Sequence, residues 1–320
     1  MSSDAKVDVL VLGGAGYIGS VLCPVLLDAG YRVRCVDSLR YNNGASLASF
    51  FSRPNFSFRR MNICDISCLR QELKQADIVV NLAALVGAPV CDKYPAEAVA
   101  VNQDAAIEVA KRLSKHQRLI FLNTNSGYGQ SYVPVTESSP LNPVSLYGKT
   151  KVYAEQQCLE NHPNCVSLRL ATVCGLSPRM RFDLLVNDWT YTLASGNNLT
   201  IYEPNFMRNY VAIEDVAMAI LFFMRHAIRV SGPFNLGNDN WNLSKKDLAA
   251  TICREVGMDF TSCIAFGDGK DPDARNYTVS NHKIKSIGFS CQENLPETIK
   301  KVANFVIATQ PKKTGNMSYE

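Results

Sequence analysis

A glycine-rich turn near the N-terminus constrains the fold of this chain more than any other feature. The apolar run 8–12 has the composition of a buried parallel strand and leads directly into 13–19, where three glycines are spaced GxxGxxG. Apolar residues then recur at helical spacing up to Gly30, and a second strand, 32–36, ends at Asp37. Strand, tight turn, helix, strand and acid within about thirty residues predict a βαβ unit with a dinucleotide site.

Each part of this unit has a role in holding a dinucleotide. Gly13 permits the tight turn, Gly16 lets backbone N–H groups approach a pyrophosphate, and Gly19 lets the helix pack closely on the strand. The helix N-terminus favours the anion. Asp37 is placed to accept hydrogen bonds from a ribose 2′-OH and to repel a 2′-phosphate, which favours NAD over NADP, although Arg40 nearby weakens this preference. The alternative is a purely structural turn without a ligand.

A second pattern, YxxxK, pairs Tyr147 with Lys151 in a predicted helix over 147–160. Positions i and i+4 share one face of a helix. A lysine cation there is expected to lower the tyrosine pKa from about 10 towards neutrality, so that the phenol can act as a general acid or base. Taken alone, the pair is equally typical of an amphipathic surface helix.

Strands and helices alternate along the first half of the chain. The predicted strands are 56–61, 78–83, 119–124 and 166–171, with helices at 66–74, 96–113 and 147–160. This alternation predicts an α/β fold with a doubly wound parallel sheet covered on both faces, the Rossmann arrangement.

The pattern becomes less regular after about Gly175. The predicted helices there are 184–194, 213–225, 244–256 and 296–308, and the predicted strands are 199–202 and 233–236. We expect an NAD-binding domain over 1–175, a smaller α/β substrate-binding domain over 176–308 that is partly interleaved with it, and a flexible tail over 309–320.

Composition excludes several classes of function. Among 320 residues the net charge is +4 with both signs interleaved, and no basic block suggests nucleic acid. The start is polar and no apolar run reaches membrane-spanning length, so we expect a cytoplasmic protein without a membrane partner. Eleven scattered cysteines without CxxC predict mainly buried free thiols in a reducing compartment. The four histidines lie far apart and predict no metal site.

Taken together, these residues resemble the extended short-chain dehydrogenase/reductase family that acts on nucleotide sugars, over about residues 7–308. The segments that carry the resemblance are 13–19, 64–66, 81–84, Thr124 with 128–129, Tyr147 with Lys151, and 208–211 before Asp215. The resemblance implies that Tyr147 is the acid/base, that Lys151 holds the nicotinamide ribose, and that Thr124 binds the reacting sugar hydroxyl.

The resemblance also implies two binding sites. The implied NAD contacts are Gly13, Gly16, Tyr17, Ile18, Gly19, Asp37, Asp65, Ile66, Leu82, Ala83, Ala84, Tyr147 and Lys151, with Asp65 and Ile66 on either side of the adenine. The implied contacts with a nucleotide-diphosphate sugar are Val86, Gly87, Asn125, Ser126, Arg179, Asn187, Arg208 and Arg275. Arg208 and Arg275 are the diphosphate candidates, because a guanidinium binds phosphate in a bidentate way.

The residues that follow Thr124 exclude some of the reactions known in this family. Family 4,6-dehydratases carry an Asp-Glu pair there, whereas this chain has Asn125 and Ser126, which cannot do carboxylate chemistry. The glutamate used by decarboxylating members is also absent. A dehydrogenase that releases a keto-sugar and an epimerase that returns the hydride both remain open.

Two longer sequence segments resemble one subgroup of this family. The segments 123–129 and 177–188 resemble GDP-heptose C4 dehydrogenases of surface-polysaccharide pathways, while the Thr-Asn pair also resembles CDP-sugar 2-epimerases. The chain departs from the common pattern at Asn209 and Thr172, which leaves the nucleotide and the sugar open. The resemblance further implies a homodimer formed through helices 96–113 and 147–160. A non-catalytic NAD-binding sensor is the remaining alternative.

Overall fold

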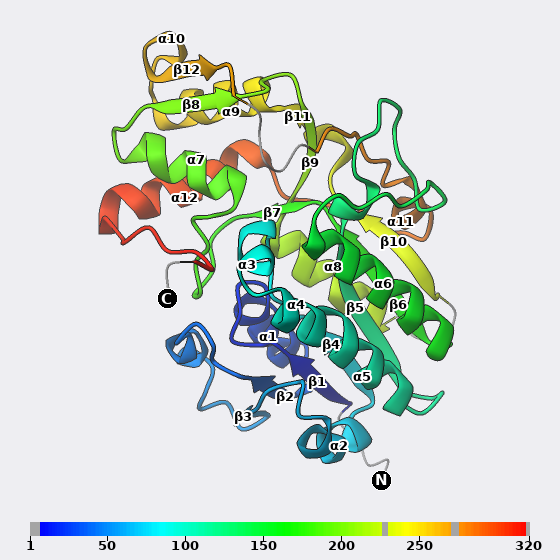
Figure 1. The fold of residues 1–320 in the computed structure, drawn as a ribbon. Helices are drawn as coiled ribbons and strands as arrows, with labels where there is room; N and C mark the ends of the chain where they lie inside the picture. Colours follow the sequence, from blue (N-terminus) through cyan, green and yellow to red (C-terminus); the bar gives the residue numbers. More distant parts are fainter. Residues whose placement is uncertain (1–6, 226–229, 270–274, 318–320) are drawn as a thin grey trace.

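A seven-stranded parallel sheet forms the centre of the computed structural model, which describes residues 7–225, 230–269 and 275–317 (Figure 1). The strand order is β10-β6-β5-β4-β1-β2-β3. The bounds are β1 Asp8–Leu12, β2 Arg32–Asp37, β3 Phe56–Arg60, β4 Ile78–Asn81, β5 Arg118–Thr124, β6 Cys165–Leu170 and β10 Gly232–Leu236. This order is the doubly wound arrangement, so the predicted fold class is confirmed.

Helices cover both faces of the sheet, because alternate residues of each strand point to opposite sides. Val9 and Val11 pack in the core under α1 (Gly19–Asp28) and α8 (Ile213–Arg225). Leu10 and Leu12 pack in the opposite core. That second face is covered by α2 (Ile66–Gln75), α5 (Ala106–Arg112) and α6 (Leu146–Asn161).

The predicted helix over 96–113 is present as one continuous helical stretch with an irregular middle. It consists of α4 (Pro95–Val99), a π-helical segment over Ala100–Ala105, and α5. Asn102 in the π-helical segment accepts a 2.7 Å hydrogen bond from the N–H of Leu85 and donates a 2.9 Å bond to its carbonyl. The irregular turn therefore fixes the loop that follows β4.

A second group of elements lies at one end of the sheet (Figure 1). It contains a three-stranded sheet in the order β11-β9-β7 and a parallel pair, β12-β8. The strands are β7 Thr172–Cys174, β8 Leu199–Tyr202, β9 Met207–Ala212, β11 Asn242–Ser244 and β12 Ile264–Gly267; the helices are α7 Leu185–Ala194, α9 Lys245–Val256, α10 Phe260–Cys263 and α12 Leu295–Thr309. Two short helices, α3 (Ala88–Lys93) and α11 (His282–Ser286), complete the described chain.

The chain passes between the two groups several times. After β7 and α7 it returns to the large sheet through α8 and β10, and β10 pairs with β6. The boundary drawn near residue 175 therefore divides the chain in sequence but not in space. Within the described residues, no helix is long and apolar enough to cross a membrane. All eleven cysteines are free thiols, and eight of them are buried.

The C-terminal segment differs from the sequence-based prediction. A flexible tail was expected over 309–320, of which 318–320 lie outside the described residues, but residues 311–317 run back along α7 to the loop that precedes it and make specific contacts. The N–H of Phe182 donates a 2.7 Å hydrogen bond to Thr314 O, and Asn316 is 4% exposed. The prediction was wrong for this segment, because its polar residues bind partners in the fold rather than solvent.

Candidate active site

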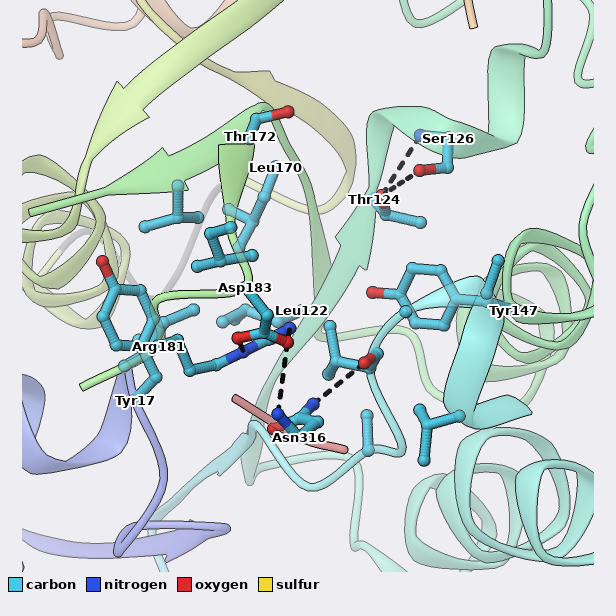
Figure 2. A pocket seen from close by; sticks show the side chains of 18 of the residues that line it. Tyr17, Leu122, Thr124, Ser126, Tyr147, Leu170, Thr172, Arg181, Asp183 and Asn316 are labelled. Carbon is cyan, nitrogen blue, oxygen red and sulfur yellow. Dashed lines mark hydrogen bonds and ion pairs between the residues drawn. The ribbon is translucent and has the colours of Figure 1, made fainter. Parts of the chain in front are cut away.

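A cavity of about 490 Å³ opens at the carboxyl ends of the central strands, where the two groups of elements meet. The predicted residues that line it are Gly13, Gly16, Tyr17, Ile18, Gly19, Leu82, Ala84, Val86, Gly87, Thr124, Ser126, Tyr147, Lys151, Arg179, Arg208 and Arg275. Residues from seven separate parts of the sequence therefore line one cavity. Figure 2 shows Tyr147 pointing into it from α6, opposite Tyr17 and Arg181.

The helix α6 is held against the sheet by a buried carboxylate. Glu155, one turn after Lys151, is 1% exposed. It accepts hydrogen bonds from Arg169 at 2.6 Å, Ser167 at 2.5 Å and Asn123 at 2.7 Å. Buried charges that are paired and fully bonded fix geometry, because any other arrangement leaves a charge without a partner. Tyr147 and Lys151 thus project from a rigid element.

Tyr147 and Thr124 are brought together at the end of β5. Burial raises the pKa of Tyr147, and a side-chain hydrogen bond with Thr124 is one of the interactions that oppose this rise. Thr124 Oγ1 donates to Ser126 Oγ at 3.0 Å, and Arg275 Nη1 also donates to Ser126 Oγ. Figure 2 shows the contacts between Thr124 and Ser126 at the end of β5, with the Tyr147 hydroxyl facing the cavity beside them.

The electrostatics of Tyr147 differ from the sequence-based prediction. Part of the Tyr147 ring is exposed to solvent in the cavity, but protein atoms surround the rest of the side chain. This burial raises the pKa of Tyr147 to about 12. The charge that opposes this most strongly is the Arg181 guanidinium, followed by Arg275. The expectation that Lys151 would bring this pKa towards neutrality is not met, because desolvation outweighs the nearby charges.

Lys151 is itself desolvated. It is 3% exposed, and burial lowers the pKa of its ammonium to about 8. Its Nζ lies 4.1 Å from the centre of the Phe121 ring, a cation–π contact that partly replaces lost hydration. The pKa of Lys151 therefore lies close to physiological pH.

The model of the NAD dependent epimerase/dehydratase family matches residues 9–237 of this chain. The chain belongs to this family. It is an NAD-dependent enzyme, and the predicted family is confirmed.

Individual relatives are distant but match along most of their length. The low-salt glycan biosynthesis protein Agl12 of Haloferax volcanii is 25% identical over 314 residues, covering 94% of this chain and 98% of that protein. UDP-glucose 4-epimerase of Halalkalibacterium halodurans is 28% identical over 276 residues, covering 78% and 80%. DesIV, the dTDP-glucose 4,6-dehydratase of Streptomyces venezuelae solved with NAD bound, has a TM-score of 0.83 at 23% identity, covering 95% of this chain and 98% of that one. That likeness shows the shared fold.

The glycine loop fits the NAD of this family. Gly13 has φ +84°, and a Cβ on it would lie 2.8 Å from Ala83 N. A Cβ on Gly19 would lie 2.5 Å from Gly13 O. Gly16 lines the cavity beside them. The backbone is therefore packed so tightly at Gly13 and Gly19 that only glycine fits there, as the predicted phosphate-binding turn requires.

Asp37 stands at the end of β2 as predicted. Its two oxygens accept hydrogen bonds from the N–H groups of Ala15 at 3.1 Å and Leu39 at 2.8 Å, while burial raises its pKa. Arg40, which was expected to weaken the preference for NAD, forms an ion pair with Glu97 instead. The arginine near the carboxylate is Arg179, whose charge lowers the Asp37 pKa and whose guanidinium lies 4.7 Å from the Tyr41 ring.

The adenine contacts stay predictions. Asp65 caps α2 by accepting a bond from the Cys68 N–H at 3.4 Å, and Ser67 Oγ donates to it at 2.8 Å. Ile66 follows in the first turn of that helix. Neither residue lines the cavity within the described chain, nor does Ala83, whose backbone packs against Gly13.

Two of the predicted sugar ligands have structural roles. Asn187 is fully buried; its amide donates to Tyr17 Oη at 3.1 Å and to Arg181 O at 3.0 Å, and it accepts from Gly175 N at 3.0 Å. Asn125 is 1% exposed, and its amide pairs with Arg169 O and Ala171 N when its oxygen and nitrogen are exchanged. Neither Asn187 nor Asn125 lines the cavity within the described chain, so their contact with substrate stays a prediction.

Arg208 and Arg275 line the same cavity from different segments. Arg208 lies in β9 and is 3% exposed. The N–H of Tyr277 donates a 3.1 Å bond to Met207 O, which places the segment of Arg275 beside β9. Both arginines therefore line one cavity, and because a guanidinium can bind phosphate oxygens in a bidentate way, their binding of a diphosphate stays a prediction.

Sequence reasoning missed an ion pair and two tail residues in the cavity wall. Arg181 binds Asp183 through two hydrogen bonds, Nε to Oδ1 at 3.0 Å and Nη2 to Oδ2 at 2.8 Å. Asn316 and Met317 line the cavity as well. The spacing Arg-x-Asp within 181–183 is a signal that could have indicated the pair, whereas nothing in the sequence around Asn316 indicates a place in this wall.

Proposed function

We propose that this chain oxidises the sugar of a nucleoside-diphosphate sugar at C4. The activity that fits best is that of a 4-dehydrogenase, with a GDP-heptose-like substrate, in surface-polysaccharide biosynthesis. One observation carries the proposal. Thr124, Tyr147 and Lys151 share a cavity in which the two carboxylates of the described lining, Asp183 and Asp188, are both held in ion pairs. Such a site supports hydride chemistry, and its described residues offer no unpaired carboxylate for an elimination.

The two carboxylates of the lining support this choice. Within the described chain these are Asp183, paired with Arg181, and Asp188, which binds Lys313 Nζ at 2.5 Å. Elimination of a sugar hydroxyl needs one group to protonate the leaving oxygen and another to remove a carbon-bound proton. Asn125 and Ser126, at the positions after Thr124, supply neither. The reaction that fits is oxidation without dehydration.

Each residue of the site has a separate role in the proposed reaction. Thr124 binds the reacting hydroxyl, Tyr147 as tyrosinate accepts its proton, and Lys151 orients the nicotinamide ribose. Arg208 and Arg275 bind the diphosphate and thereby fix the distance of the sugar from the phenol. NAD, when bound, supplies the hydride acceptor.

A second candidate uses the same residues. A C4 or C2 epimerase would return the hydride to the opposite face after the keto-sugar turns within the site. The similarity to UDP-glucose 4-epimerases favours this reading. The two reactions differ only in whether NADH persists.

We also propose a cytoplasmic homodimer formed through the α4–α5 stretch and α6. Tyr153 on α6 is 48% exposed, which is unusual for an aromatic side chain beside a rigid buried face and fits an interface. Analytical ultracentrifugation tests the assembly, since Tyr153→Glu should yield monomers if this face pairs.

The decisive experiment has two steps. Ligands carried through purification are first identified by mass spectrometry, and the protein is then assayed with UDP-, GDP-, CDP- and dTDP-sugars while NADH absorbance is recorded. Lasting NADH, with a keto-sugar product, supports the dehydrogenase. A changed sugar without net NADH supports the epimerase. Binding of NAD without any turnover would contradict both.

A further inference from the structure

The last described residues cross from the second group of elements to the cavity. After α12 the chain turns at Gln310, which has φ 43°. Tyr191 Oη then donates a 3.0 Å hydrogen bond to Pro311 O, and Lys313 binds Asp188. These contacts seat the start of the segment on α7.

The middle of the segment fits closely around Asp183. Phe182 N donates to Thr314 O at 2.7 Å, and Asn316 N donates to Asp183 Oδ2 at 3.2 Å. Between them, a Cβ on Gly315 would lie 2.5 Å from Asp183 Cγ. The segment therefore passes this carboxylate at a distance that only glycine permits.

The Asn316 side chain joins two walls of the cavity. Its Oδ1 accepts a 3.0 Å hydrogen bond from Arg179 Nη2, and its Nδ2 donates a 2.9 Å bond to Val86 O. Val86 belongs to the loop after β4, and Arg179 to the loop after β7. Figure 2 shows Asn316 between Asp183 and the side of the cavity that carries Tyr147. One buried carboxamide thus fixes both loops relative to each other.

We propose that Asn316 and Met317, at the end of the segment 311–317, belong to the active site and form the wall that selects the glycosyl group of the substrate. This inference rests on the proposed function, because it presumes that the cavity takes a nucleotide sugar.

The chemistry of this wall defines the class of sugar. A carboxamide has two Nδ2 hydrogens; within the described chain Val86 O takes one, and the other can be offered to a sugar hydroxyl. The adjacent charges each face an opposite charge: Arg181 pairs with Asp183, Lys313 pairs with Asp188, and the charge of Arg179 acts on the Asp37 carboxylate. Met317, 41% exposed, adds an adaptable apolar surface for sugar carbons. We therefore expect selection for a neutral, hydroxyl-bearing glycosyl group over one that carries a carboxylate.

Binding measured with and without the sugar isolates this contribution. Dissociation constants of the full chain are measured by calorimetry for GDP-mannose against GDP, and for UDP-glucose and UDP-glucuronate against UDP. The dissociation constant of the nucleotide divided by that of the nucleotide sugar gives the contribution of the glycosyl group to affinity. Asn316→Ala should lower that ratio about tenfold for the preferred neutral sugar, the loss expected for one or two hydrogen bonds. Gly315→Ala should act in the same direction, because its Cβ displaces the segment.

Lys312→Ala, in the same segment and exposed, is the matched control and should leave the ratio unchanged. NAD affinity and melting temperature of each variant verify that the fold is intact. A ratio for Asn316→Ala within twofold of wild type, or a wild-type preference for UDP-glucuronate, overturns the inference alone. A wild-type chain whose affinity gains nothing from any glycosyl group overturns both the inference and the proposed function.

Discussion

The ammonium of Lys151 lies over the face of the Phe121 ring, 4.1 Å from its centre. Phe121 is a buried β5 residue packed under α6, so the helix places its cation over an aromatic ring of the core rather than in water. A cation–π contact recovers only part of a hydration energy. The charge is thus held at a cost to stability, and its pKa of about 8 reflects that cost.

Replacing this lysine should therefore stabilise the free protein. Because the folded pKa lies below the usual 10.5, the unfolded chain binds more protons between about pH 8 and 10.5, and wild-type stability rises with pH across that window. Lys151→Met removes the titration, so its advantage should be largest below pH 8, at most on the order of 3 kcal/mol. Urea unfolding at pH 7 and pH 10 checks this. Equal differences at both values would contradict it.

Tyr147→Phe should abolish nearly all hydride transfer and leave NAD binding intact. The substitution removes the hydroxyl and its hydrogen bond with Thr124 but keeps the ring in the cavity wall. A general base typically contributes a factor of about 10² to 10⁴. Steady-state turnover and NAD titration measure the two effects separately. Activity within about tenfold of wild type would show that the phenol is not the base.

Arg181→Met should move the pH profile to higher pH. Besides burial, Arg181, Arg275 and a hydrogen bond with Thr124 lower the pKa of Tyr147, and Cys91 raises it. Without Arg181 the pKa of Tyr147 rises further, so the limb of kcat/KM that requires tyrosinate shifts upward. Arg53→Met, in an exposed pair with Asp28, is the control and should not shift it. If the pH profile of Arg181→Met does not shift, this guanidinium does not act on the Tyr147 pKa and only pairs with Asp183.

Asp37→Ala should weaken NAD binding and relax discrimination against NADP. The carboxylate lies at the end of β2 and is positioned by two backbone N–H groups, while Arg179 supplies a cation nearby. Removing the anion removes its repulsion of a 2′-phosphate. Fluorescence titration with NADH and NADPH gives the ratio of affinities. A ratio equal to that of wild type would mean that Asp37 only shapes the turn.

Strong local signals made most of the fold predictable. The strands β4, β5 and β6 and the helices α8 and α9 begin and end within two residues of the predicted bounds, because continuous apolar runs and helical spacing identify buried elements. The short strands β7 and β11, of three residues each, carry no such period and were not predicted.

The site was predictable where a motif carries the chemistry and not where packing decides it. Thr124, Tyr147 and the glycine loop lie together as expected. The pKa of Tyr147 could not be read from the spacing of Lys151, because it depends on desolvation and on Arg181 from another segment. Asn187 looked like a ligand from its place in a motif, but only the structure shows its amide bound to Tyr17 and Arg181.

The hydrogen bond between Asn316 and Val86 also bears on the order in which the molecule assembles. The two residues are 230 positions apart in the chain. Joining distant segments costs loop entropy before any contact repays it, so such contacts form late in folding. The βαβ unit around Gly13 is local by comparison and can form early. A refolding chain should therefore acquire affinity for the dinucleotide first and the ability to tell one sugar from another last.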